Sequence, residues 1–239
     1  MSWLVLATVT PILTAVGYFS GLFWLLPLLQ VAAAYPWMIL DLRRGGVAKA
    51  LPRMLAWALL IAVSVEALAF FFPAEGATSV LNGATYREEM LRWIRTGVGK
   101  ESSPSLFLPE HLLHLAAFLV LSLATGGFLS LLMGAVMMNF MSFYVGSLLM
   151  ISVRPVRVIL CGWPPWAVLR VAAFVLIGLC LAEPVLFAAG RRLGRPPAPP
   201  GGPRGAWYLV AGVLLLSDIV LKFVFATVWA ALLRPCLVP

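Results

Sequence analysis

Long runs of apolar residues separated by short polar segments form the main pattern of this sequence. An α-helix needs about 20 apolar residues to cross a hydrocarbon core of about 30 Å, and in lipid its backbone must satisfy its own hydrogen bonds. The runs therefore predict an all-α fold, a polytopic transmembrane helix bundle that forms a single integral membrane domain over residues 1–239. We expect about six spans, at approximately 15–40, 51–72, 106–125, 128–152, 170–189 and 207–233.

The first apolar run, residues 3–40, contains no charged residue and three prolines. It is too long for one straight helix and barely long enough for two. We favour one tilted span that ends near Leu40, preceded by an interfacial or re-entrant piece. A double crossing is the alternative, and it would give seven spans with the N-terminus inside. A short basic loop, residues 41–53, follows in either case.

The longest polar region, residues 74–105, is predicted to be an outer loop that contains an amphipathic helix over residues 86–95. At helical spacing, its apolar residues fall near one face and Arg92 falls on another. Such a helix is typical of the membrane interface. Arg92, Trp93 and the nearby Glu110 are therefore candidate interface residues. The apolar face comprises Tyr86, Met90, Trp93 and Ile94.

Glycine and proline mark two further connections. Gly126-Gly127 lies in the middle of an apolar stretch and predicts a tight hairpin between two spans. Residues 190–206 are rich in proline and glycine and carry several arginines, so they predict an extended loop on the cytoplasmic side.

Composition supports lipid exposure, because 62% of the residues are hydrophobic and 11% are charged. Soluble domains average roughly 45–50% apolar and about 25% charged residues. The net charge of +8 does not predict a nucleic-acid partner, since no basic run is interleaved with aromatic residues. The three cysteines are scattered and indicate neither a disulfide framework nor a zinc cluster. The partner that follows directly is the lipid bilayer.

The basic residues predict the orientation, because short cytoplasmic loops are enriched in Lys and Arg. Six spans place two basic loops on one side and two weaker basic segments on the other. This bias makes the first side cytoplasmic and fits a bacterial cytoplasmic (inner) membrane. The first group is Arg43, Arg44, Lys49, Arg53, Arg191, Arg192, Arg195 and Arg204, and the second is Arg154, Arg157 and Arg234.

Charged residues within spans are candidate functional residues, since each costs at least about 2.5–3.5 kcal/mol to insert. Asp218 and Lys222 lie one helical turn apart, which predicts an internal ion pair or an ion or proton relay. Glu66 has no local partner, so it is protonated, paired with another helix or facing water. Asn139 is expected to make hydrogen bonds between helices.

Both histidines of the chain, His111 and His114, share one helical stripe at the start of the third predicted span. Metal binding would require further ligands, for which Glu66, Glu110 and the neighbouring methionines are available, but no H-E-x-x-H motif is present. We therefore predict no metal site, and the sequence does not indicate a particular cofactor.

Two functional hypotheses follow. The first is a transporter or permease-like component, or a structural subunit of a membrane complex, with other membrane subunits or a second copy as partners. The alternative is a membrane-embedded enzyme of the hydrolase type that uses Glu66, Glu110, His111 and His114 near the outer interface. We favour the first because the Walker, Rossmann, nucleophile-elbow and kinase patterns are absent.

Overall fold

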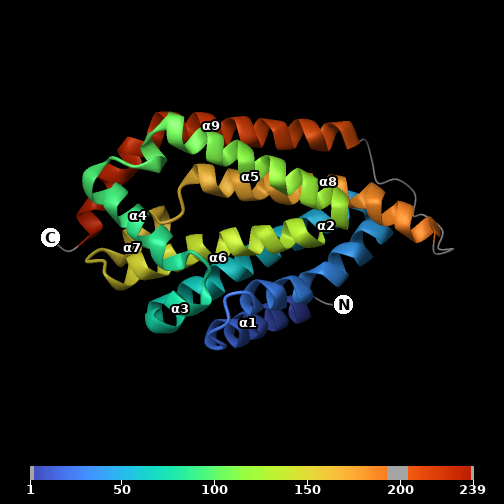
Figure 1. Ribbon diagram of the computed structural model, residues 1–239, viewed down its shortest axis with the longest axis horizontal. Coiled ribbons are helices and arrows are strands. Elements are labelled where there is room, and N and C mark those ends of the chain that lie inside the picture. The colour runs from blue at the N-terminus through green and yellow to red at the C-terminus, as the bar shows by residue number, and fades with distance from the viewer. Residues whose placement is uncertain (1–2, 193–203, 238–239) are drawn as a thin grey trace.

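The computed structural model describes residues 3–192 and 204–237 (Figure 1). Within these residues the chain is almost entirely helical and has no strand, which confirms the predicted all-α fold. The elements are α1 (Trp3–Phe19), α2 (Leu25–Phe71), α3 (Pro73–Ser79), α4 (Gly83–Thr96), η1 (Lys100–Ser102), α5 (Pro104–Thr125), α6 (Phe128–Met150), α7 (Pro155–Cys161), α8 (Pro165–Arg192), α9 (Arg204–Leu233) and η2 (Arg234–Cys236).

In the described part of the chain, five helices are long and apolar enough to cross a membrane: α2, α5, α6, α8 and α9. Many of their large apolar side chains are exposed, among them Leu209, Leu216 and Phe223 on α9. Large exposed apolar patches are rare on water-soluble proteins, and on helices of this length such side chains face lipid. The protein is therefore a multi-pass helical membrane protein.

Helix α2 folds back on itself. Its 47 residues would span about 70 Å as a straight helix, more than twice the hydrocarbon core. The backbone leaves the helical conformation at Gly45–Gly46, where Gly46 has a φ of +65°. The indole N–H of Trp57 donates to the carbonyl oxygen of Gln30 at 3.0 Å, although these residues are 27 apart in sequence. The halves 25–44 and 47–71 therefore lie side by side and antiparallel.

The expected basic loop at residues 41–53 is mostly helical, with its turn confined to the two glycines. Asp41, which is 2% exposed, forms an ion pair with Arg53 across this turn. Arg53 neutralises the buried carboxylate of Asp41, so Asp41 does not require a longer, solvent-exposed loop.

The N-terminal region also differs from the expected single tilted span over 15–40. The chain breaks between α1 and α2, and the two helices pack antiparallel. A Cβ on Gly17 would lie 2.6 Å from the Cα of Leu26, so a small residue is required at this close approach. Arg53 lies over the ring of Trp3, 5.5 Å from its centroid. The start of α1 is therefore next to the turn of α2.

The predicted hairpin at Gly126-Gly127 is present between α5 and α6. The two glycines have φ values of +59° and +91°, in the left-handed region that residues with a Cβ rarely adopt. Each therefore fits the conformation that the turn requires.

One end of the bundle, which we call the capped end, is covered by α3, α4, η1 and α7 (Figure 1). Helix α4 is amphipathic as predicted, but its apolar face packs on protein. Met90, Trp93 and Ile94 are buried in one cluster with Tyr144 of α6 and Val158 of α7. The cap is thus part of the core.

The opposite end, the basic end, holds the turn of α2, the end of α8 and the start of α9 (Figure 1). A guanidinium nitrogen of Arg43 lies 3.3 Å from the position that a Cβ would take on Gly190, next to Arg191 and Arg192. Basic residues far apart in sequence therefore gather at this end. Most of the predicted loop at 190–206 lies outside the described residues, since 193–203 are not described.

Candidate functional site

A buried ion pair joins α8 to α9. Both carboxylate oxygens of Asp218, which is 0% exposed, accept hydrogen bonds from the Nε and Nη2 atoms of Arg170 at 2.9 Å each. This bidentate geometry is the strongest form of the arginine–carboxylate interaction. The pair neutralises the charges of Arg170 and Asp218. Without the partner, burial of either charge in the membrane interior would be energetically costly.

A second ion pair joins α9 to the cap. The Nζ atom of Lys222 lies 3.0 Å from Oε1 of Glu101 in η1, and 4.5 Å from the ring centroid of Phe107. The expected pair between Asp218 and Lys222 is thus replaced by two pairs. Each of the two finds a partner on another element, which ties α9 to α8 and to η1.

His111 of α5 lies beside the first ion pair. Its Nε2 is 3.6 Å from Oδ2 of Asp218, which is outside hydrogen-bond distance, and it has no hydrogen-bond partner. The side chain is nevertheless buried, at 6% exposed. A buried polar nitrogen without a hydrogen-bond partner lowers the stability of the folded protein by about 1–3 kcal/mol. His111 Nε2 is therefore available to form a hydrogen bond with another group.

A cavity beneath the cap, which we call the polar cavity, is lined by Glu101, His111, Arg170 and Lys222 but not by Asp218. It encloses about 710 Å³, including the part open to the surface. Trp93 of α4 is 1% exposed and lines this cavity, and its indole N–H has no acceptor. The charged and polar lining residues include Tyr86, Glu89, Lys100, Glu101, Glu110, His111, His114, Arg170 and Lys222.

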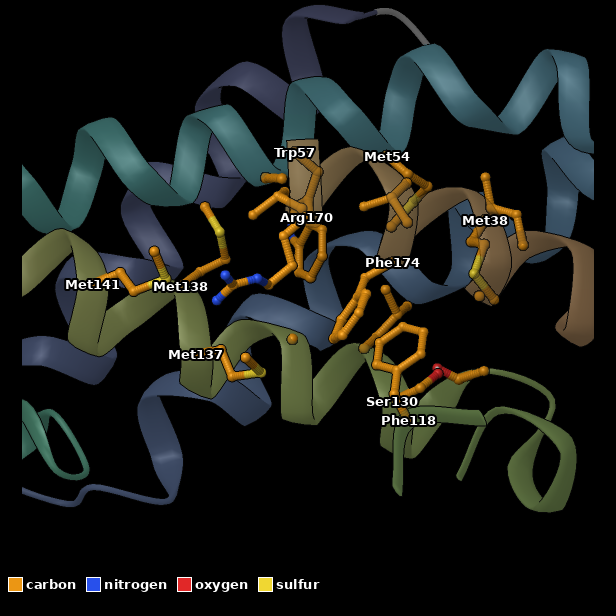
Figure 2. Close-up of a pocket in the computed structure, with 18 of the residues that line it drawn as sticks. Met38, Met54, Trp57, Phe118, Ser130, Met137, Met138, Met141, Arg170 and Phe174 are labelled. Carbon is orange, nitrogen blue, oxygen red and sulfur yellow. The ribbon is translucent and has the colours of Figure 1, made fainter. Parts of the chain in front are cut away.

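A second cavity, the apolar cavity, lies deeper between α2, α5, α6 and α8 (Figure 2). The space between its lining atoms amounts to about 700 Å³ when the part open to the surface is included. The two cavities share Met137, Met141 and Arg170 as lining residues. Figure 2 shows the guanidinium of Arg170 near these methionines, at one end of a mainly apolar space. Its walls include Met38, Met54, Trp57, Phe118, Gly134 and Phe174.

Glu66 lies apart from this site. Its carboxylate accepts a hydrogen bond from the indole N–H of Trp163, and it lines neither cavity. The four residues of the hydrolase hypothesis are therefore not brought together: Glu110, His111 and His114 share the polar cavity, and Glu66 does not.

Asn139 also has a separate place, in the core between α2 and α6. Its side-chain amide exchanges two hydrogen bonds with that of Gln30, at 2.8 and 2.9 Å. Both side-chain amides are buried, so the pair fixes how the two helices face each other.

The candidate interface residues differ in their exposure. Arg92 is exposed. Trp93 is buried and does not face the membrane surface or a protein partner, because α4 turns its apolar face inward onto α6. Glu110 lies 3.6 Å from Nζ of Lys100, which is also 3.5 Å from Glu89. The carboxylate of Glu110, followed by that of Glu89, raises the pKa of Lys100.

Sequence reasoning missed two members of the site, Arg170 and Glu101. Arg170 stood at the expected boundary of a span and Glu101 in an expected outer loop, where charges are ordinary. The available signal was the pair of buried charges on α9, which required partners of opposite sign. In the described part of the chain, no group of three or more His, Cys, Asp or Glu side chains is placed to hold a metal ion.

Comparisons with protein families, with curated proteins and with solved structures found no match to this chain. The function must therefore be argued from the two cavities and the groups that line them.

Proposed function

We propose that this protein is a permease-like membrane component that binds an anionic group in the polar cavity and moves it along α6. The supporting observation is that two basic side chains of the spanning helices line this cavity, the partly buried Arg170 and the buried Lys222, and that Lys222 is held by a single carboxylate from the cap. A charge inside a membrane protein that faces a cavity typically belongs to a substrate or ion pathway.

The length of the lined space favours transport over a closed binding site. The apolar cavity continues from Met141, next to the polar cavity, to Gly127 at the hairpin of α5 and α6. Met141 of α6 and Gly127, the N-cap of α6, are 14 positions apart, which corresponds to about 21 Å, or two thirds of the hydrocarbon core. The lined space therefore extends most of the way between the capped and basic ends.

We further propose that the basic end is cytoplasmic, because it gathers the arginines of two connections. The polar cavity then lies toward the outer surface, and in a bacterium the membrane is the inner one. A structural role in a larger complex remains compatible with the exposed apolar faces, and other membrane subunits or a second copy would then cover part of them.

Uptake into proteoliposomes tests this function. We expect labelled alkyl carboxylates or alkyl phosphates to enter vesicles that contain the protein faster than protein-free vesicles. Lys222→Gln removes the cation and is expected to abolish uptake, whereas Arg92→Gln on the exposed face of α4 leaves it unchanged. If no anion of either class enters above the protein-free rate, the proposal is wrong.

A hydrolase is the second candidate, because His111 lies near the carboxylate of Asp218 in a cavity. Two observations weigh against it. Asp218 is already engaged by Arg170 through both oxygens, so it does not orient the imidazole. Among the described residues, the lining of the polar cavity also contains no serine, threonine or cysteine. Turnover of an ester or peptide probe that is lost in His111→Ala plus His114→Ala, with assembly retained, would support this candidate instead.

A further inference from the structure

We infer that the two cavities form one site for a single-chain amphiphile, with a carboxylate or phosphate head in the polar cavity and its hydrocarbon chain in the apolar cavity. The inference rests on the proposed function and names its substrate class. Its starting point is that the cavities adjoin at Met137, Met141 and Arg170. A ligand that fills both must therefore be polar at one end and apolar along the rest.

The head-group chemistry follows from the unpaired groups of the polar cavity. The indole N–H of Trp93 is only a donor, and it is buried without an acceptor. His111 Nε2 is likewise buried without a partner. Buried groups of this kind are rare in proteins and are satisfied by whatever occupies the space beside them. The Trp93 donor is matched by an acceptor oxygen of a head group, and so is His111 in the tautomer that carries its proton on Nε2.

The charge of the head group follows from Lys222. It is held at 3.0 Å by Glu101, a side chain from the short η1 segment and not from a spanning helix. An anionic head can take the place of this carboxylate without leaving the ammonium unpaired in the interior. Arg170 is less available, because Asp218 already engages it through two hydrogen bonds. We therefore assign Lys222 as the cation that the head group contacts.

The tail chemistry follows from the walls of the apolar cavity. Apart from Arg170 at one end and Ser130, the lining side chains are apolar, with methionines from both α2 and α6. Methionine side chains are flexible and adapt to an irregular apolar ligand. Ser130 donates its hydroxyl to the carbonyl oxygen of Gly127 and offers no free donor to a ligand. One unbranched hydrocarbon chain suits this space.

Binding of labelled hexadecanoate and hexadecyl phosphate to the full-length protein in nanodiscs tests the site. Hexadecanol is the control without a charged head, and butyrate is the control without a long chain. We expect saturable binding of at least one of the two long-chain anions, and binding of both controls at least about tenfold weaker, which corresponds to about 1.4 kcal/mol. A preference between the two anions identifies the head group.

Two substitutions at the head position are expected to act in opposite directions. Lys222→Gln removes the contacted cation and should weaken binding at least about tenfold. Glu101→Gln removes the competing carboxylate and should strengthen binding. Arg92→Gln, an exposed cation on α4, is the control and should leave it unchanged. If the ion pair served only to hold the cap in place, both substitutions would weaken binding together, and the inference would be wrong.

A substitution at the tail position keeps the test independent of the ion pair. Gly134 lines the apolar cavity, and a Cβ there would meet nothing within 4 Å. Gly134→Leu should therefore fold and fill part of the cavity, and weaken binding of the long-chain anions at least about tenfold. Gly212→Leu on α9 is the matched control, since Gly212 is equally open but lines neither cavity.

The outcomes separate this inference from the proposed function. Equal affinity for hexadecanol, or unchanged affinity in Gly134→Leu, overturns the amphiphile site. Saturable, variant-sensitive binding without uptake in proteoliposomes supports the site and overturns transport. If butyrate is taken up and Gly134→Leu does not change this uptake, transport is supported and the long-chain substrate is ruled out.

Discussion

The pair formed by Arg170 and Asp218 gives a sharp test of the structure. Asp218→Asn preserves the shape of the side chain but removes its charge, and it leaves the guanidinium of Arg170 buried without a counter-ion. Removal of one partner of a buried pair costs about 3–5 kcal/mol. We expect about 3 kcal/mol, at the lower end, because the Arg170 side chain keeps 17% of its exposure and so retains some solvation.

The double variant decides what this loss means. With Arg170→Gln added to Asp218→Asn, no charge is left unpaired, and two amides occupy the place of the ion pair. We expect the double variant to lose about 1 kcal/mol or less, since replacement of both partners of a buried pair is often close to neutral. The losses of stability in the single variants Asp218→Asn and Arg170→Gln should therefore not add up to the loss in the double variant. The coupling energy between the two side chains should be about 2 kcal/mol or more.

Equilibrium unfolding of the purified protein in mixed micelles, followed by helical circular dichroism, measures these free energies. Arg92→Gln is the control for loss of an exposed arginine and should change stability by less than about 0.5 kcal/mol. Additive losses in the double variant would refute the reasoning, because they would mean that the two side chains act independently and do not contact each other as the structure has them.

Three further outcomes can be measured. Gly146→Ala should destabilise the protein by about 1–3 kcal/mol, because its Cβ would lie 2.4 Å from a carbonyl oxygen of α2, whereas Gly134→Ala on the same helix should cost nothing. Unfolding of Gln30→Leu or Asn139→Leu should show a loss of about 1–3 kcal/mol each, with much of it recovered in the double variant. Burial raises the pKa of Tyr86 well above its usual value of about 10, so absorbance should detect no phenolate from Tyr86 at about pH 10. The raised pKa belongs to the folded state. The contribution of Tyr86 to stability is therefore complete below about pH 10 and is lost as the pH rises through the raised pKa.

The periodicity of the sequence was sufficient for the helices and for the hairpin at Gly126-Gly127, since both depend on neighbours along the chain. It was not sufficient for the turn at Gly45–Gly46. Two glycines between helical runs are compatible with a loop or with a tight turn, and only the packing of Trp57 against Gln30 selects the turn. The helix pair at the N-terminus depends in the same way on contacts between segments.

The site was predictable only in part, because spacing shows which residues share a face but not what that face meets. Asp218 and Lys222 were recognised as charges that require neutralisation. Their partners lie 48 and 121 positions away, and no local pattern connects them. Trp93 illustrates the same limit: an apolar face on a polar segment suits a membrane surface and a protein surface equally well.

The position of the charges also constrains how the cap can move. Lys222 is 4% exposed and its partner Glu101 belongs to η1, so movement of the cap away from α9 would leave an ammonium group unpaired in the interior. Loss of one partner from a pair that stays buried costs about 3–5 kcal/mol, and water that enters as the cap opens lowers this cost for Lys222. In the proposed function, an anion that binds Lys222 lowers this cost further, so we expect access from the capped end to be coupled to anion binding.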